Sequence, residues 1–376
     1  MRKIEMSDLV TQYHRIKPEV DAAMQEVLET GRFIGGPALD SFVKHLTAYL
    51  EVGYVVPCAN GTDALQIAMM ALNLQPGDEV ITADFTYAAT AEVIALLKLT
   101  PVLVEVNPKT FNIDPAAIEK AITPKTKAIV PVHLFGQCAD MEPILTLAAK
   151  HQLFVIEDTA QAIGAWYTFS DGIRKRAGTM GTVGTTSFFP SKNLGCFGDG
   201  GALFTNDEQL AKRLKMIANH GQSVQYQFDD IGCNSRLDNL QAAILGVKLK
   251  YLDDYCAARQ AVAKTYDDAF RHLHNATIPQ RAANSTHVFH QYTLKLKPGS
   301  DRAAIRAALA QAGVPSMVYY PSPMHRQKAY SNPRYRDADF PISIELSETV
   351  LSLPIHTEMG EDQLSHIIES VKKVIS

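Results

Sequence analysis

Seven short runs of β-branched and apolar residues alternate with stretches of helical spacing between residues 54 and 205. The runs are residues 54–57, 79–82, 101–106, 128–132, 153–158, 185–189 and 202–205. Helical spacing lies between most of them, as at Ala64, Ile67 and Ala71. This alternation predicts a mostly parallel, seven-stranded sheet flanked by helices. Ligands of such sheets bind outside the carboxyl ends of the strands, so we look for chemistry there.

Charge and hydropathy exclude several classes of function. The chain of 376 residues carries 36 Lys and Arg against 40 Asp and Glu, a net charge of −4. Nucleic-acid binding relies on a basic face, so we expect no nucleic-acid partner. No apolar run approaches the roughly 18 residues of a membrane span, and acids occupy the N-terminal stretch where a secretory signal is apolar. We therefore expect a cytoplasmic protein with no membrane partner.

The five cysteines are Cys58, Cys138, Cys196, Cys233 and Cys256. They are odd in number, lie far apart and include no CxxC pair. This pattern favours reduced, buried thiols over a disulfide framework or a zinc site. We expect no metal.

The pattern changes after Asp238, which indicates a second domain. A helical region runs to about Leu273 with a break near Asp253 and Asp254. Residues 288–296 alternate like a strand, 301–312 are helical, 314–320 are extended and 362–375 are helical. Because one core rarely serves so long a chain, we predict two domains. They are a large α/β domain of residues 1–250, with an N-terminal helix, and a small α+β domain of residues 251–376.

The first stretch with chemical character is residues 58–65, Cys-Ala-Asn-Gly-Thr-Asp-Ala-Leu, which follows a strand and opens a helix. Free N–H groups at a helix N-terminus, with a glycine that allows close approach, make an anion site. The same residues also suit a plain turn with an N-cap. Both interpretations remain open from these residues alone.

The second stretch ends an apolar strand at Asp158. A carboxylate there can cap a helix, or it can face a cationic ring nitrogen. Opposite charges about 4 Å apart interact with roughly 4 kcal/mol at an effective dielectric constant near 20, whereas an ordinary hydrogen bond contributes about 1 kcal/mol. An acid in that position would therefore set the protonation state of such a ring.

The third stretch places Lys192 between aromatic and apolar residues, ahead of the glycine-rich residues 198–201. A lone lysine is most often a surface charge. In an apolar loop, however, desolvation lowers its pKa and makes the neutral amine available as a nucleophile.

The order of these stretches resembles the fold-type I enzymes that use pyridoxal 5′-phosphate (PLP). More closely, the chain resembles the DegT family of nucleotide-sugar aminotransferases. The motifs that carry the resemblance are Asn-Gly-Thr-Asp-Ala-Leu (60–65), Glu-Asp-Thr-Ala-Gln (157–161), Ser-Phe-Phe-Pro-Ser-Lys (187–192) and Gly-Asp-Gly-Gly-Ala (198–202). It extends over nearly the whole chain, from Phe-Ile-Gly-Gly-Pro (33–37) to Tyr-Pro-Ser-Pro-Met-His (320–325).

The resemblance implies two catalytic residues. Lys192 would attach the cofactor covalently and, once released, carry the proton between the cofactor and the substrate carbon. Asp158 would hold the ring nitrogen protonated so that the ring can accept electrons.

The resemblance also implies the remaining cofactor contacts. Gly61, Thr62 and Ser187 would hold the phosphate. Gln161 would bond the phenolic oxygen, and Tyr87 would stack on the ring.

Asn234 matches an asparagine that the family extends across a dimer interface to the same phosphate. The resemblance therefore implies a homodimer with shared active sites. A helix-start turn ahead of Leu237 is the competing interpretation of Asn234.

On the substrate side, Arg236, His325 and Tyr320 match positions that the family directs toward the sugar. An arginine fork suits a carboxylate or a diphosphate. The chain looks most like family members that use L-glutamate to aminate C3 of a UDP-linked 2-acetamido-3-keto hexuronic acid. Amination of C3 or C4 in dTDP- or GDP-linked 6-deoxy keto sugars is the alternative. His133 either packs beside the cofactor or satisfies a loop carbonyl.

Three rival functions are weighed against this one. In related sugar dehydratases a histidine replaces the lysine, so Lys192 argues against that activity. A dehydrogenase should show GxGxxG after the first strand, and residues 178–184 have other spacing and lie late in the sheet. A PLP-binding regulatory protein would carry a basic DNA-binding module, for which we find no segment in this chain.

Overall fold

The computed structural model describes residues 2–375. Its centre is a seven-stranded sheet with the order β1-β9-β8-β5-β4-β2-β3. The strands are β1 (Tyr54–Cys58), β2 (Glu79–Ala83), β3 (Thr100–Val104), β4 (Thr126–Val130), β5 (Phe154–Asp158), β8 (Val183–Ser187) and β9 (Gly201–Thr205). Six of these strands share one direction, and β9 runs antiparallel to them. The predicted sheet is confirmed, with each strand within two residues of its expected bounds.

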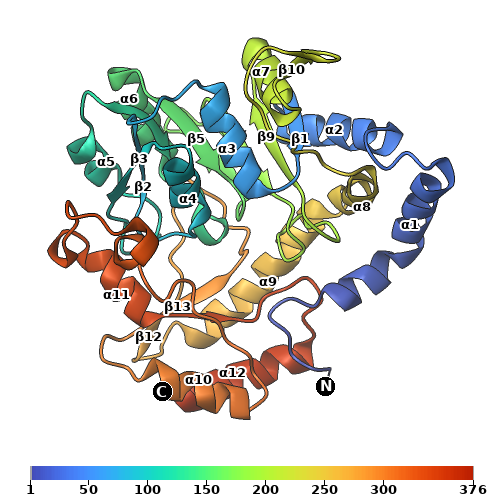
Figure 1. The fold of residues 1–376 in the computed structure, drawn as a ribbon. Helices are drawn as coiled ribbons and strands as arrows, with labels where there is room; N and C mark the ends of the chain where they lie inside the picture. Colours follow the sequence, from blue (N-terminus) through green and yellow to red (C-terminus); the bar gives the residue numbers. More distant parts are fainter. Residues whose placement is uncertain (1, 376) are drawn as a thin grey trace.

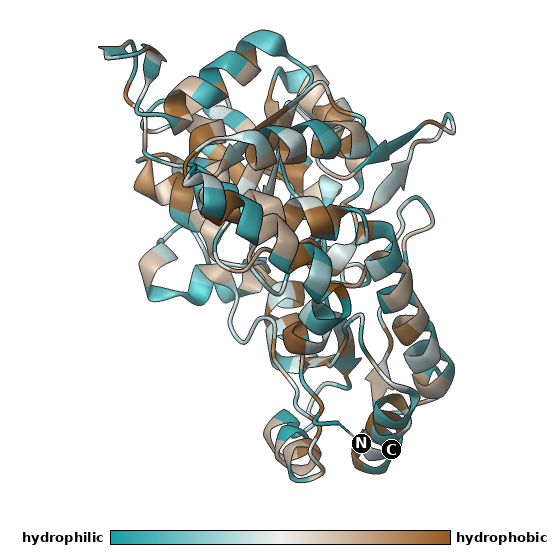
Figure 2. Cartoon of the chain, turned by 90° about the vertical axis from the view of Figure 1, so that its right-hand side faces the viewer, coloured by the Kyte–Doolittle hydropathy of each residue, from teal (hydrophilic) through white to brown (hydrophobic). Residues whose placement is uncertain are grey.

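Helices cover both faces of the sheet (Figure 1). They are α3 (Gly61–Ala71), α4 (Ala89–Leu96), α5 (Pro115–Ala121), α6 (Met141–His151), α7 (Glu208–Ala218) and α8 (Asn239–Leu249). Adjacent strand residues point to opposite faces, so Ile81 and Ile129 join one apolar cluster while Val80 and Val130 join the other. Both clusters are buried, which explains why the central strands read as unbroken apolar runs. Figure 2 shows hydrophobic residues where elements meet and hydrophilic residues along outward helix faces.

Two N-terminal helices precede the sheet: α1 (Leu9–Thr30) and α2 (Pro37–Leu50). Asp8 caps α1 by accepting a hydrogen bond from the Thr11 N–H. Ile16 and Val20 of α1 are buried against Ile244 and Val247 of α8. The predicted N-terminal helix therefore packs on this chain's own α8.

The C-terminal helix α11 (Pro341–Thr349) packs Leu346 into the cluster of Ile81 and Ile129. A third apolar cluster gathers the other C-terminal elements. They are α9 (Leu252–Phe270), β12 (Ala276–Thr277), β13 (Tyr292–Leu296), α10 (Arg302–Gln311), β14 (Val350–Leu353) and α12 (Glu361–Ile375). The antiparallel order of the small sheet is β12-β13-β14. Ile4 is buried in the same cluster, so the chain's first residues contribute to this core.

The helical region breaks at residues 250–251 rather than near Asp253 and Asp254. These two acids lie in the first turn of α9, where the positive end of the helix dipole stabilises them. They therefore mark a helix start rather than an interruption. The strand expected over 288–296 is confined to β13, and the extended segment 314–320 pairs only at Met317, with Ser352.

Two hairpins project from the core: β6 (Trp166–Thr168) with β7 (Arg174–Arg176), and β10 (Gln222–Val224) with β11 (Gln227–Phe228). Arg174 and Lys175 are exposed, but Arg176 is buried and stacks on Trp166 at 4.1 Å from the ring centre. The first two basic residues of this hairpin are therefore exposed to solvent, and the third is not.

Short 3₁₀ helices complete the chain at η1 (Leu134–Gly136), η2 (Met324–Arg326), η3 (Lys328–Tyr330) and η4 (Asp337–Asp339). Across residues 2–375, no helix has the length and apolar character needed to cross a membrane. Four of the cysteines are buried and Cys233 is partly buried.

Candidate active site

The carboxyl edge of the sheet brings the three chemically distinctive stretches together. Asp158 ends β5, Ser187 ends β8, and α3 begins three residues after β1. Residues 84–87 follow β2 at the same edge. The topology therefore gathers groups that lie up to about 130 residues apart in the sequence.

Asp158 is a buried carboxylate with two hydrogen-bond donors. Its Oδ1 accepts from the Ala160 N–H at 3.1 Å, and its Oδ2 accepts from Thr90 Oγ1 at 3.2 Å. Burial raises the pKa of Asp158, while these hydrogen bonds and the charge of Lys192 oppose the rise. Within residues 2–375 no cation forms a salt bridge with it. A cationic group bound beside this carboxylate would relieve the cost of its burial.

Lys192 lies in the loop that follows β8. Its backbone N–H donates to the Phe189 carbonyl at 2.8 Å. Desolvation lowers the pKa of Lys192 to about 8, with Asp158 opposing the shift. At pH 7, on the order of one molecule in ten then carries the neutral amine, far more than for a solvated lysine. The side chain is therefore suited to act as a nucleophile.

The first turn of α3 lies directly against Ser187. Asn60 caps the helix by accepting from the Asp63 N–H at 2.8 Å. A Cβ atom added to Gly61 would stand 2.7 Å from the Ser187 Cβ, which is closer than real contacts allow. The close approach leaves the free N–H groups of the helix start beside a serine hydroxyl, a suitable cradle for a phosphate.

Gln161, Tyr320 and Tyr87 form a connected group. Gln161 accepts from the Phe135 N–H at 2.7 Å and donates through Nε2 to the Tyr320 hydroxyl at 3.0 Å. The Tyr320 ring centre is 6.0 Å from that of Phe85 and 6.2 Å from that of Tyr87. Burial raises the pKa of Tyr320, so its phenol is neutral. Tyr87 is 60% exposed and has an open face for a planar ligand.

His133 is fully buried in the structure. Its Nε2 contacts Glu157 Oε2 at 2.9 Å, and its Nδ1 accepts from the Ala139 N–H at 3.0 Å. Glu157 also receives the N–H groups of Gly178 and Met180. The partners of His133 are thus a carboxylate and an amide, not the loop carbonyl that the sequence left open.

His325 lies between two carboxylates. Asp84 accepts from the His325 backbone N–H and contacts its Nδ1, both at 2.7 Å, and Asp337 contacts its Nε2 at 3.1 Å. The ring stacks on Phe340 with centres 4.4 Å apart. In this chain His325 ties η2 to the end of β2. The substrate contact predicted for it would require the ring to give up the Asp337 carboxylate.

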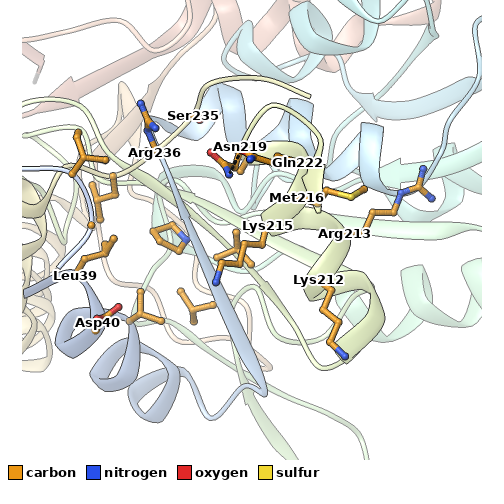
Figure 3. Close-up of a pocket in the computed structure, with 18 of the residues that line it drawn as sticks. Leu39, Asp40, Lys212, Arg213, Lys215, Met216, Asn219, Gln222, Ser235 and Arg236 are labelled. Atoms are coloured by element: carbon orange, nitrogen blue, oxygen red, sulfur yellow. Dashed lines mark hydrogen bonds between the residues drawn. The ribbon is translucent and has the colours of Figure 1, made fainter. Parts of the chain in front are cut away.

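Asn234 and Arg236 are exposed on the loop that leads into α8. Between them, Ser235 is buried and accepts from the Ala59 N–H at 3.0 Å, which anchors the loop beside the start of α3. Arg236 lines a cavity of about 1130 Å³. Figure 3 shows Leu39 of α2 on one side of this cavity and Arg213 of α7 on the other.

One contact of the site had not been anticipated from the sequence. Thr90 donates to Asp158 from the first turn of α4. Its position three residues after Tyr87, in the helix that follows a strand end, is the signal that could have identified it.

The match to known proteins covers almost the whole chain. The model of the DegT/DnrJ/EryC1/StrS aminotransferase family matches residues 14–372. The chain belongs to this family. It is an enzyme of the aminotransferase class, as the resemblance had indicated.

Three curated relatives show the range of names within the family. A UDP-2-acetamido-2-deoxy-3-oxo-D-glucuronate aminotransferase of Pseudomonas aeruginosa is 47% identical over 94% of this chain and 95% of its own. A pleiotropic regulatory protein of Geobacillus stearothermophilus is 43% identical over 98% and 97%. A UDP-N-acetyl-3-dehydro-α-D-glucosamine 3-aminotransferase of Acidithiobacillus ferrooxidans is 41% identical over 99% and 98%.

Solved structures agree with the fold. DesV of Streptomyces venezuelae superposes with a TM-score of 0.94 at 38% identity, over 99% of this chain and 98% of that one. NtdA of Bacillus subtilis, crystallised with the cofactor PMP, superposes with a TM-score of 0.91 at 34% identity, over 100% and 86%. The fold is that of the PLP-dependent transferases of type I.

Proposed function

We propose that this enzyme uses PLP to move the amino group of L-glutamate to C3 of a UDP-linked 2-acetamido-3-keto hexuronic acid. The observation that carries the proposal is that two groups lie at the carboxyl edge of the sheet. They are the buried carboxylate of Asp158, which forms no salt bridge within residues 2–375, and the desolvated amine of Lys192. The Pseudomonas relative, whose name specifies such a sugar, supports the substrate.

The residues present fit the cofactor on three independent counts. Gly61 leaves the space beside Ser187 that a side chain would fill, and the phosphate suits that cradle. Asp158 forms no salt bridge within residues 2–375, and a pyridinium nitrogen would supply a cationic partner for it. Tyr87 offers an exposed ring for stacking. When bound, PLP would supply an electron sink for the electrons of the substrate carbon.

The chain's own groups then have separate tasks. Lys192 in its neutral form takes the proton from the substrate carbon and returns it, which its pKa of about 8 permits near neutral pH. Asp158 holds a proton on the ring nitrogen through its charge. Gln161 is held in place by hydrogen bonds with Phe135 and Tyr320, and it would present its amide to the phenolic oxygen of the cofactor.

The exposed positions of Asn234 and Arg236 support a shared site in a homodimer. Both side chains are open to solvent in the single chain, whereas Lys192 is desolvated, so we assign the contacts predicted for them to the partner subunit. The hairpin just before them exposes Val224, Tyr226 and Phe228, which are 60–82% accessible. Exposed apolar side chains of this kind commonly mark an interface.

Mixed dimers test the sharing of residues. Lys192→Ala and Asn234→Ala are each expected to be nearly inactive alone. If Asn234 acts across the interface, a mixed dimer of the two variants has one intact site, so activity returns on co-expression. Failure of the mixture to regain activity, with mixed dimers verified by differential tags, would place Asn234 in its own subunit's site.

Arg236 provides the test of the sugar. We expect Arg236→Ala to raise KM for the 3-keto hexuronic acid more than for its uncharged 3-keto hexose analogue, because arginine binds a carboxylate through two hydrogen bonds. Equal losses on both sugars would contradict recognition of a C6 carboxylate. Faster turnover of a dTDP-linked 6-deoxy keto sugar would favour the alternative substrate class.

The Geobacillus relative is named a regulatory protein, which suggests a second candidate function. A PLP-binding regulator would bind the cofactor without releasing 2-oxoglutarate. Transfer of ¹⁵N from labelled glutamate to the nucleotide sugar, followed by mass spectrometry, separates the two. Cofactor binding with no ¹⁵N transfer to any keto sugar would contradict the proposed enzyme.

A further inference from the structure

A buried nitrogen without a hydrogen-bond partner lies on the segment that packs beside Lys192. It is His290 Nδ1, for which the structure of residues 2–375 shows no donor. Buried polar atoms are nearly always hydrogen-bonded, so this nitrogen is available to accept from a donor that comes within reach.

The backbone of this segment is fixed from two sides. Asn193, the neighbour of Lys192, donates through Nδ2 to the Val288 carbonyl at 3.1 Å. On the other side the Val288 N–H donates to the Gly136 carbonyl at 2.8 Å. A Cβ atom on Gly136, whose φ is +109°, would stand 2.8 Å from the Phe289 nitrogen. The fit leaves little freedom for the segment to move.

A third contact holds His290 itself. Arg259 donates through Nη1 to the carbonyls of Phe289 at 3.1 Å and His290 at 3.4 Å. Burial, the charge of Lys192 and the charge of Arg259 together hold the pKa of His290 well below its usual range. The imidazole is therefore neutral and keeps one nitrogen lone pair as an acceptor.

Lys192 has the complementary need. A lysine ammonium carries three donors, and the Lys192 ammonium has no hydrogen-bond acceptor among the described residues. Asp158 attracts it from one side, while burial opposes its charge. In the proposed function the amine is released once in each half of the reaction and must remain close to the substrate carbon.

We propose that His290 is a positioning residue for Lys192, whose released ammonium is held by His290 Nδ1. The proposal rests on the proposed function. This acceptor balances the pull of Asp158, so the amine stays over the reacting carbon instead of leaning toward the ring nitrogen. It also stabilises the ammonium, so its removal should lower the pKa of Lys192.

The test measures the pKa of Lys192 in cofactor-free protein by competitive acetylation at a series of pH values, with mass spectrometry of the Lys192 peptide. His290→Leu is expected to lower this pKa by about one unit, a tenfold change in the proton's dissociation constant, since it removes one hydrogen bond to a charged group. His290→Asn keeps a side-chain acceptor and should restore most of the difference.

His356→Leu is the matched control. His356 is also buried, has an unpartnered Nε2 and has its pKa lowered by burial and by Arg259, yet Lys192 is not among the charges that act on it. Its substitution should leave the pKa of Lys192 unchanged. If His290→Leu does not fold, His290→Phe also removes the acceptor and should lower the same pKa by a similar amount.

The direction of the shift separates positioning from a structural role. If His290 only filled space, its loss would admit water and raise the pKa of Lys192 toward that of a solvated lysine. A raised or unchanged pKa in folded His290→Leu, or an equal lowering in His356→Leu, would overturn the proposal. The acetylation needs no cofactor, so a wild-type protein that never captured PLP would contradict the proposed function without affecting this result.

Discussion

Gly61→Ala is the substitution whose effect follows most directly from the geometry of the site. The new Cβ would stand 2.7 Å from Ser187 Cβ and 3.2 Å from Ser187 Cα. Ordinary contact begins at 3.4 Å, so the start of α3 and the end of β8 would have to separate by about 0.7 Å. Ser187 Cα belongs to a central strand and cannot yield freely, so α3 should move.

The magnitude follows from the phosphate contacts that this movement would lengthen. A hydrogen bond to a charged group contributes about 1.5–3 kcal/mol, and each 1.4 kcal/mol is tenfold in affinity. Loss of one such contact predicts a decrease in PLP affinity of about 10- to 100-fold. The crowding itself should cost about 1–3 kcal/mol of stability, partly offset by alanine's advantage over glycine in a helix, about 0.5–1 kcal/mol.

Gly246→Ala in α8 is the matched control, because a Cβ there meets nothing within 4 Å. It should stabilise the protein by about 0.5–1 kcal/mol and leave PLP affinity unchanged. The assays are a PLP titration followed by absorbance and urea unfolding of the cofactor-free proteins. Wild-type PLP affinity in Gly61→Ala would refute the assignment of the phosphate to the start of α3.

Three further predictions test other parts of the site. Asp158→Asn should slow the glutamate half-reaction about a thousandfold, as expected for an ion pair of roughly 4 kcal/mol, and stopped-flow absorbance measures it; a loss below tenfold would contradict the pairing with a ring cation. The rate at which cofactor-free protein captures PLP should rise about tenfold per pH unit up to about pH 8 and then level off, because the lowered pKa of Lys192 sets the fraction of neutral amine. A plateau reached only near pH 10 would mean that the lysine is solvated. Glu157→Ala should destabilise the fold by about 3 kcal/mol or more in urea unfolding, since it leaves His133 and the N–H groups of Gly178 and Met180 buried without their acceptor; a loss under 1 kcal/mol would contradict that role.

The parts of the fold predicted from the sequence are those governed by local pattern. Buried central strands require continuous apolar runs, so the sheet could be located within a few residues. Asp158 and Lys192 could be identified because Asp158 ends one such run and Lys192 lies in the loop after another.

Other parts depend on contacts between distant residues. His325 and Asp84 are 241 residues apart, and no local pattern indicates that a carboxylate holds this ring. The orphaned Nδ1 of His290 likewise arises from tertiary packing, in a run that read simply as a strand. The prediction of a helix break at Asp253 and Asp254 was wrong because acidic residues suit a helix start as well as a turn.

The most direct test of the proposed reaction is the absorbance spectrum of the purified enzyme with bound PLP before and after addition of L-glutamate, beside the Lys192→Ala variant. The proposed reaction predicts that glutamate converts the bound PLP to pyridoxamine phosphate in the wild type alone, with one 2-oxoglutarate released per site, and that the 3-keto sugar nucleotide restores the first spectrum. A wild-type spectrum that glutamate leaves unchanged, or conversion at the same rate in Lys192→Ala, would contradict it.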